Sequence, residues 1–69
     1  MTVKIKEDFI KLDSLLKLAG IASTGGHAKI MITEGQVLYN GEVCLQRGRK
    51  VRPGDSVTAD GEIITVEKL

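Results

Sequence analysis

Four basic side chains lie within six positions of one another, in a part of the chain that has no acidic residue. The interval between Glu42 and Asp55 contains no charged residues other than Arg47, Arg49, Lys50 and Arg52. A guanidinium group donates paired hydrogen bonds that match phosphate oxygens, whereas a lysine ammonium acts as a point charge. Because arginine predominates, the cluster favours phosphate binding over the alternative, an ordinary solvated loop.

Catalytic and metal chemistry find little support in the sequence. The possible nucleophiles are Ser23, Ser56 and Cys44. The only histidine that could act as their general base is His27. Cys44 falls within a predicted strand, where a small buried thiol is expected. One cysteine and one histidine cannot form a disulfide framework or a Cys/His zinc site. We therefore expect no catalytic residue, no bound metal, no cofactor and no small-molecule substrate.

Composition places the chain among small soluble domains. Its 69 residues make a single domain, residues 1–69, and 42% hydrophobic with 28% charged residues argue for a folded chain. No apolar run reaches the length of a membrane span, no signal peptide is recognisable, and one cysteine suits a reducing compartment. We expect a cytoplasmic protein. The net charge of only +1 means that a nucleic-acid partner would depend on the local basic cluster.

The first half of the chain predicts a strand and two helices. Alternation at residues 3–6 indicates a short strand. Leu12, Leu15, Leu16 and Ala19 follow the helical spacing, and Gly20 is placed to end that helix. Ser23 and Thr24 are capping types ahead of a second helix that ends near Gly35 and buries the face formed by Ala28, Met31 and Ile32.

The second half predicts two β-hairpins. Residues 37–39 and 43–45 flank Asn40-Gly41, and residues 56–59 and 62–66 flank Asp60-Gly61, both typical of tight type I′ turns. Residues 67–69 are predicted to be a tail. The predicted core consists of Leu12, Leu15, Leu16, Ala28, Ile32, Val37, Val43, Val51, Val57 and Ile64. The expected fold is α+β, with two short helices packed on a small, mainly antiparallel sheet of four to five strands.

An ordered series of short motifs runs through most of the chain, from about residue 11 to residue 59. It comprises Leu12-Asp13-x-x-Leu16, Gly20-Ile21-Ala22-Ser23, Ala28-Lys29, Ile32, Gly35-x-Val37, Asn40-Gly41 and Val51-x-Pro53-Gly54-Asp55. No single motif is specific, but the series at these spacings resembles the S-four RNA-binding domain family. The small stand-alone bacterial proteins of its YaaA-like group look most similar in Thr24-Gly25-Gly26-His27-Ala28-Lys29 and Arg47-Gly48-Arg49-Lys50.

The resemblance implies the alpha-L fold and an RNA-binding surface made by the start of the second helix and the loop after the first hairpin. Transferred to this sequence, that surface consists of Ser23, Thr24, Gly25, Gly26, His27 and Lys29, opposite Arg47, Arg49, Lys50 and Arg52. Free amides at a helix N-terminus attract phosphate, and glycine permits close approach. The implied partner is structured RNA, either ribosomal RNA or tRNA, or the ribosome, bound without catalysis.

The sequence departs from the commoner form of this family at the second helix. That form carries an arginine after the capping serine and more basic residues along the helix. Here Thr24 and two glycines take that place, and the helix offers only Lys29 and His27. The sequence leaves open which RNA is bound, the process served and the oligomeric state.

Simpler explanations exist for each of these residues. Thr24 is a cap in either case, Gly25 and Gly26 suit a permissive loop, and His27 and Lys29 suit a solvated surface. With two aromatic residues, stacking of several bases is not expected, so binding would rely on charge and shape. Two other functions stay open. One is a protein-interaction adaptor that presents the basic loop to an acidic partner, and the less favoured is binding of duplex DNA.

Overall fold

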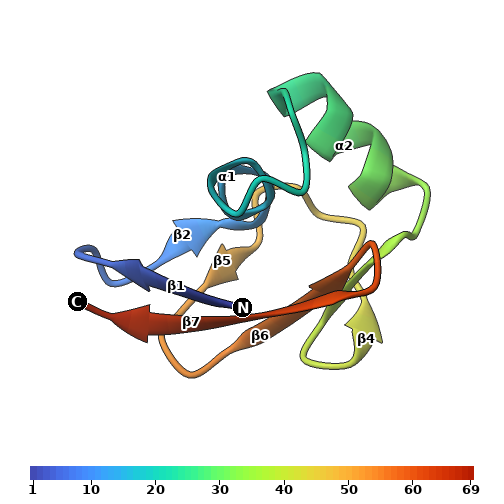
Figure 1. Ribbon diagram of the computed structural model, residues 1–69. Coiled ribbons are helices and arrows are strands. Elements are labelled where there is room, and N and C mark those ends of the chain that lie inside the picture. Colours follow the sequence, from blue (N-terminus) through green and yellow to red (C-terminus); the bar gives the residue numbers. More distant parts are fainter.

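The computed structural model describes all residues, 1–69, as a layer of strands with two helices on one side (Figure 1). Helix α1 spans Leu12–Leu18 and helix α2 spans Gly25–Thr33. The strands are β1 (Thr2–Ile5), β2 (Ile10–Lys11), β3 (Val37–Tyr39), β4 (Glu42–Val43), β5 (Lys50–Val51), β6 (Ser56–Ala59) and β7 (Glu62–Lys68). The structure confirms the α+β prediction of two helices on a small sheet.

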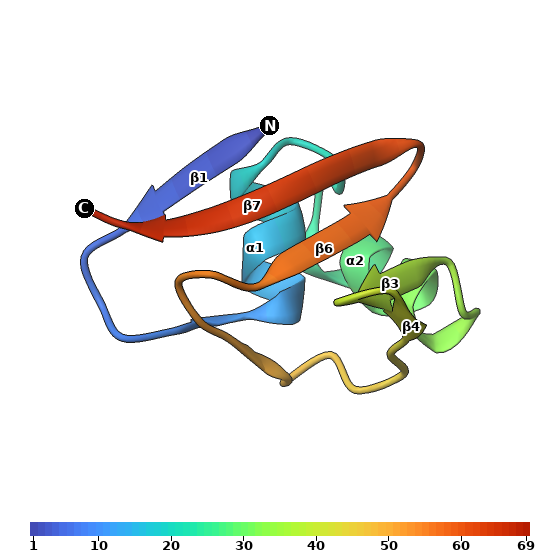
Figure 2. The same ribbon diagram turned by 90° about the horizontal axis from the view of Figure 1, so that it is seen from below.

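Five strands form the main sheet in the order β1-β7-β6-β3-β4. All neighbouring pairs are antiparallel except β1 and β7, which run parallel and lie side by side in Figures 1 and 2. Strands β2 and β5 make a separate two-stranded sheet, in which Lys11 pairs with Lys50. The prediction of a mainly antiparallel sheet of four to five strands is therefore confirmed, and the small sheet is an addition to it.

The two helices begin and end at residues that the sequence predicts. The N–H of Gly20 bonds to Lys17 O and the N–H of Ile21 bonds to Leu16 O, both at 3.0 Å, with Gly20 at a φ of +78°. This is the Schellman arrangement that glycine favours at a helix end. At the start of α2, Thr24 Oγ1 accepts a hydrogen bond from the N–H of His27 at 3.0 Å, which is an N-cap contact.

Both predicted type I′ turns are present. Asn40 and Gly41 have φ angles of +50° and +87°, and Asp60 and Gly61 have +52° and +75°. Positive φ at both central residues is what this turn requires, and glycine adopts it at the second position without steric cost. The two hairpins thereby fix the register of β3 with β4 and of β6 with β7.

The core lies between the helices and the covered face of the sheet. Figure 2 views the sheet from its open side, with both helices behind it. Fifteen buried residues form one cluster, and all are apolar or cysteine. Nine of the ten predicted core residues belong to it, and Val43 does not, since it is 57% exposed. The prediction for Val43 was wrong because β4 is a two-residue strand at the edge of the sheet, with a neighbouring strand on one side only.

Two further boundaries differ from those predicted. Strand β4 ends at Val43, so Cys44 and Leu45 lie in the following loop, although Cys44 is buried as expected. Strand β7 continues through Lys68, where a tail was predicted, because β1 pairs with it as far as Lys68. Neither helix has the length and apolar character that crossing a membrane would require.

Candidate nucleic-acid interface

The loop that carries the four basic residues is fixed to the start of α1 by its backbone. We call residues 46–52, which include the short strand β5, the basic loop. Its carbonyl groups at Arg49 and Arg47 accept hydrogen bonds from the N–H groups of Leu12 (2.9 Å) and Asp13 (3.1 Å). The N-cap of α1, Lys11, makes no side-chain cap, so the basic loop satisfies amides that a cap would otherwise engage. The loop backbone is thus tied to a helix that packs in the core.

The four basic side chains of this loop are exposed, and three of them lie against aromatic rings. The Arg49 guanidinium is 4.6 Å from the centroid of the Tyr39 ring. Lys50 Nζ and Arg52 Cζ are 4.9 and 6.0 Å from the centroid of Phe9. Each cation–π contact at an exposed site contributes about 0.5–1 kcal/mol. These contacts restrict the basic side chains without neutralising their charge.

No carboxylate forms an ion pair with the basic loop. The one ion pair of the chain joins Lys68 Nζ and Asp8 Oδ1 at 3.0 Å. Arg47, Arg49, Lys50 and Arg52 therefore present their charge to solvent. An unpaired cluster of this kind attracts anions from solution, and its arginines match phosphate oxygens.

Asp55 joins the first hairpin to the end of the basic loop. Its Oδ2 accepts hydrogen bonds from Tyr39 Oη at 2.6 Å and from the N–H of Arg52 at 2.9 Å. Its Oδ1 accepts from Asn40 Nδ2 at 3.2 Å. Asn40 Oδ1 in turn accepts from the N–H of Ser56 at 2.8 Å. Asp55 thus holds the ring on which Arg49 lies, which agrees with the structural role that the sequence indicates for Asp55 and Asn40.

This network shifts the pKa values of its two ionisable side chains, Asp55 and Tyr39. Burial raises the pKa of Asp55, but the hydrogen bonds from Tyr39, Arg52 N–H and Asn40, with the charge of Arg49, outweigh burial and leave it below the usual 3.8. The hydrogen bond to Asp55, aided by burial and by the negative charge, raises the pKa of Tyr39 above its usual 10.0 despite the opposing effect of Arg49. The fold therefore stabilises the ionised form of Asp55 and the neutral form of Tyr39.

We predict that Tyr39→Phe lowers the free energy of unfolding by about 1.5 kcal/mol near neutral pH, since it removes one hydrogen bond to a carboxylate. A lowered Asp55 pKa stabilises the fold above the unfolded pKa near 4, and this contribution is lost as pH falls through the lower folded pKa. The deficit of Tyr39→Phe should therefore shrink in acid. Denaturant unfolding of the wild-type protein and of Tyr39→Phe, repeated at a series of pH values, measures this difference in free energy of unfolding.

Alkaline pH provides the internal control for this prediction. A raised Tyr39 pKa stabilises the fold below the unfolded value near 10, and the contribution is lost as pH rises through the folded value. Phenylalanine does not ionise, so this loss is absent from Tyr39→Phe, while its ring still supports Arg49. A deficit that stays constant from acid to alkaline pH would contradict the role given to the Tyr39–Asp55 bond.

The start of α2 is a second exposed polar region. His27 Nδ1 accepts a hydrogen bond from the N–H of Ser23 at 3.2 Å and lies 3.4 Å from Ser23 Oγ. With the Thr24 cap, this orders the turn that precedes the helix. A Cβ atom on Gly25 would meet no atom within 4 Å, and one on Gly26 would meet only Thr24 Oγ1, at 3.9 Å. Packing within the chain thus gives no reason for glycine at either position.

The structure brings some predicted site residues together and leaves others apart. Arg47, Arg49, Lys50 and Arg52 share one loop at the N-terminal end of α1. Residues 23–29 follow the C-terminal end of α1, and no hydrogen bond joins them to the basic loop. Helix α1 has seven residues and so is about 10 Å long. The two regions are therefore connected along the chain through α1 and the residues that follow it.

Sequence analysis missed the aromatic supports of the basic loop. Phe9 lies some forty positions before Lys50 and Arg52, and Tyr39 lies ten before Arg49. The pairing of β2 with β5, together with the backbone hydrogen bonds from Leu12 and Asp13, brings the Phe9 segment beside the loop. No local pattern signals these contacts, although an isolated aromatic beside a turn was an available hint for Tyr39. No group of three or more His, Cys, Asp or Glu side chains is placed to hold a metal ion.

Comparison with known proteins finds similar sequences along most of the chain. A family model described as the S4 domain matches residues 3–67. The "Probable ribosome maturation protein RlbA" of Bacillus subtilis (strain 168) is 41% identical over 59 residues, covering 86% of this chain and 83% of RlbA. YbcJ of Escherichia coli (strain K12) is 38% identical over 61 residues, covering 88% of this chain and 87% of YbcJ.

Solved structures agree with the fold. The solution structure of E. coli YbcJ, described as revealing an alpha-L motif involved in RNA-binding, matches with a TM-score of 0.73 and 36% identity over 96% of this chain and 85% of YbcJ. Heat shock protein 15 of Vibrio cholerae, solved as a trimer, matches with a TM-score of 0.75 and 28% identity over 88% of this chain. The present chain spans only 65% of that protein. The predicted alpha-L fold is confirmed.

Proposed function

The chain belongs to the S4 domain family, and from that premise we propose that it is a non-catalytic module that binds structured RNA through phosphate and shape contacts. RlbA is named for ribosome maturation, and YbcJ is described by an RNA-binding motif. These relatives support ribosomal RNA ahead of tRNA as the partner. The proposed site comprises the basic loop and the start of α2.

One observation carries this proposal, namely the state of the four basic side chains. They are exposed, none is in an ion pair, and three lie on the rings of Tyr39 and Phe9. A basic loop that served only solubility would need neither aromatic support nor a backbone tied to α1. Restricting side chains before binding reduces the conformational entropy lost when phosphate is bound.

The start of α2 supplies the second half of the proposed site. The amides of its first turn carry the partial positive charge of the helix N-terminus, and backbone amides there bind phosphate well. A Cβ atom on Gly25 would meet open space, and one on Gly26 would make only an ordinary contact with Thr24 Oγ1. Glycine there therefore favours a phosphate group approaching the backbone closely. Lys29 adds a positive charge on the same helix.

Salt dependence tests this function. Four to six phosphate contacts predict that the logarithm of the binding constant falls with the logarithm of salt concentration with a slope of about −3 to −5. Fluorescence anisotropy with a labelled ribosomal RNA fragment, repeated over a series of salt concentrations, measures the slope. A slope near zero, or binding only to protein partners in nuclease-treated extract, would contradict the proposal and support the adaptor function instead.

A further inference from the structure

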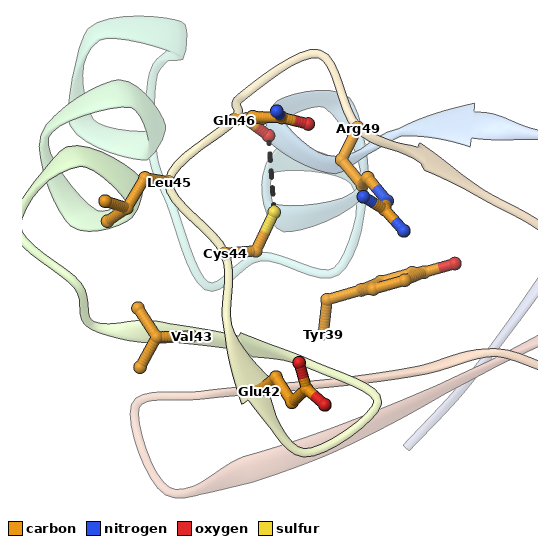
Figure 3. A pocket seen from close by; sticks show the side chains of 7 residues that line it. All are labelled: Tyr39, Glu42, Val43, Cys44, Leu45, Gln46 and Arg49. Atoms are coloured by element: carbon orange, nitrogen blue, oxygen red, sulfur yellow. Dashed lines mark hydrogen bonds between the residues drawn. The ribbon is translucent and has the colours of Figure 1, made fainter.

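A pocket lies between the first hairpin and the start of the basic loop, and its volume is about 340 Å³. Figure 3 shows its lining, with Val43 and Leu45 on one side and Arg49 stacked above the ring of Tyr39 on the other. Clefts of about 300–1,000 Å³ accommodate small organic ligands. The pocket is thus large enough for one planar ring system.

The pocket presents apolar surface that nothing in the chain covers. Val43 and Leu45 are 57% and 59% exposed, and both are large aliphatic side chains. Cys44 between them is buried, and its Sγ is directed to Gln46 O at 3.7 Å. Figure 3 marks that contact, from the thiol to a backbone carbonyl, and marks no hydrogen bond between two lining side chains. A ligand that fills the pocket would therefore remove apolar surface from water without breaking internal side-chain pairs.

The opposite wall is both flat and charged. The Arg49 guanidinium lies 4.6 Å from the Tyr39 ring centroid, and the Tyr39 hydroxyl is held by Asp55. Nucleobases stack on aromatic rings and on guanidinium planes. The hydrogen bond to Asp55 holds this wall in place before any ligand arrives, which lowers the cost of binding.

Two polar lining residues discriminate between kinds of ligand. The Glu42 carboxylate repels phosphate, which makes the pocket less suited to phosphate than the rest of the basic loop. It accepts hydrogen bonds only, which suits the exocyclic amino group of a base. The amide of Gln46 donates and accepts, as the edge of adenine requires. The aliphatic wall of Val43 and Leu45, the stacked wall of Arg49 and Tyr39, and the polar edge of Glu42 and Gln46 together match a nucleobase.

Resting on the proposed RNA binding, we propose that this pocket takes one unpaired, amino-bearing nucleobase of the bound RNA. Arg49 lines the pocket and also belongs to the basic loop, so phosphates held by Arg47 and Lys50 lie next to a base that enters. An unpaired base at a loop or bulge can turn out of its helix, and such bases are where proteins read RNA. The pocket adds one base contact to binding by charge and shape.

A pair of RNA hairpins tests the pocket. One carries a single bulged adenosine, and the other carries an abasic ribose at the same position, so both have the same number of phosphates. We expect the wild-type protein to bind the adenosine hairpin about 10-fold more tightly, within the range for stacking one base. Equal affinity for the two hairpins would overturn the pocket while leaving RNA binding intact. Failure to bind either hairpin would overturn both proposals.

The substitution Val43→Glu tests whether the preference for the adenosine hairpin arises in this pocket. It places a charge at the aliphatic wall, so the affinity ratio of the two hairpins should fall from about 10 to near 1. Ile63→Glu is the matched control, because Ile63 is a 60% exposed aliphatic residue on β7 and does not line the pocket. Both substitutions change the charge equally, and the ratio cancels any general effect on phosphate binding. A ratio that survives in Val43→Glu would place the base elsewhere and overturn the inference.

Discussion

Reversing two charges of the basic loop, with Arg47→Glu/Arg49→Glu, is expected to weaken binding of structured RNA by about 100-fold or more. Each arginine–phosphate contact is a hydrogen bond between charged groups, worth about 1.5–3 kcal/mol, and glutamate adds repulsion. Both side chains are exposed, and the hydrogen bonds of the loop to α1 use backbone carbonyls, so the fold should be unaffected. Binding is measured by anisotropy and the fold by circular dichroism.

A variant with the same change in net charge separates the local effect from the general one. Lys4 lies on β1, at the opposite sheet edge from β4, and Lys17 lies at the end of α1 away from the basic loop. Lys4→Glu/Lys17→Glu should therefore reduce affinity far less than Arg47→Glu/Arg49→Glu. Equal losses would mean that net charge, and not the basic loop, governs binding. Loss of secondary structure in the arginine variant would show that the loop serves stability.

Asp55→Ala is expected to cost about 2–4 kcal/mol of unfolding free energy. It removes the acceptor of three hydrogen bonds and leaves the Tyr39 hydroxyl and the Arg52 amide without their partner. A chain of this size has a stability of only about 3–10 kcal/mol, so the loss is a large fraction of it. The variant should also bind RNA more weakly, because Tyr39 no longer holds Arg49 in place. Urea denaturation measures the stability.

Asp8→Ala is the matched control for this prediction. Asp8 makes only the exposed ion pair with Lys68, and its side chain is 90% exposed. Such pairs contribute little, so the free energy of unfolding should change by less than about 1 kcal/mol. Similar losses in Asp55→Ala and Asp8→Ala would contradict the role of Asp55 as the group that joins hairpin and loop.

The parts of the fold that follow from the sequence are those with local causes. The spacing of Leu12, Leu15 and Leu16 predicts the buried face of α1, and Asn40-Gly41 predicts a turn whose φ angles are indeed positive. Strands β2 and β5 were not predicted, because two residues are too few for alternation and their pairing joins distant segments. The pairing of β1 with β7 likewise depends on residues more than sixty positions apart.

The candidate site likewise has parts that the sequence predicts and parts that only the tertiary structure reveals. Composition and spacing identify the charges of the basic loop and the cap at Thr24, and the structure shows those charges unpaired and that cap formed. The supports of the loop depend on tertiary contacts, so Phe9 and Tyr39 could not be assigned to it from the sequence. Asp55 was expected to be structural, but its bond to Tyr39 required the hairpin to bring the two together.

Competition among nucleic acids tests the central claim most directly. Purified protein is bound to a labelled ribosomal RNA fragment at two salt concentrations and challenged with unlabelled ribosomal RNA, tRNA or duplex DNA of similar length. RNA binding by phosphate and shape predicts that the RNAs compete well, ribosomal RNA best, that duplex DNA competes poorly, and that higher salt weakens binding. Equal competition by duplex DNA, or no binding to any of these RNAs, would contradict the account.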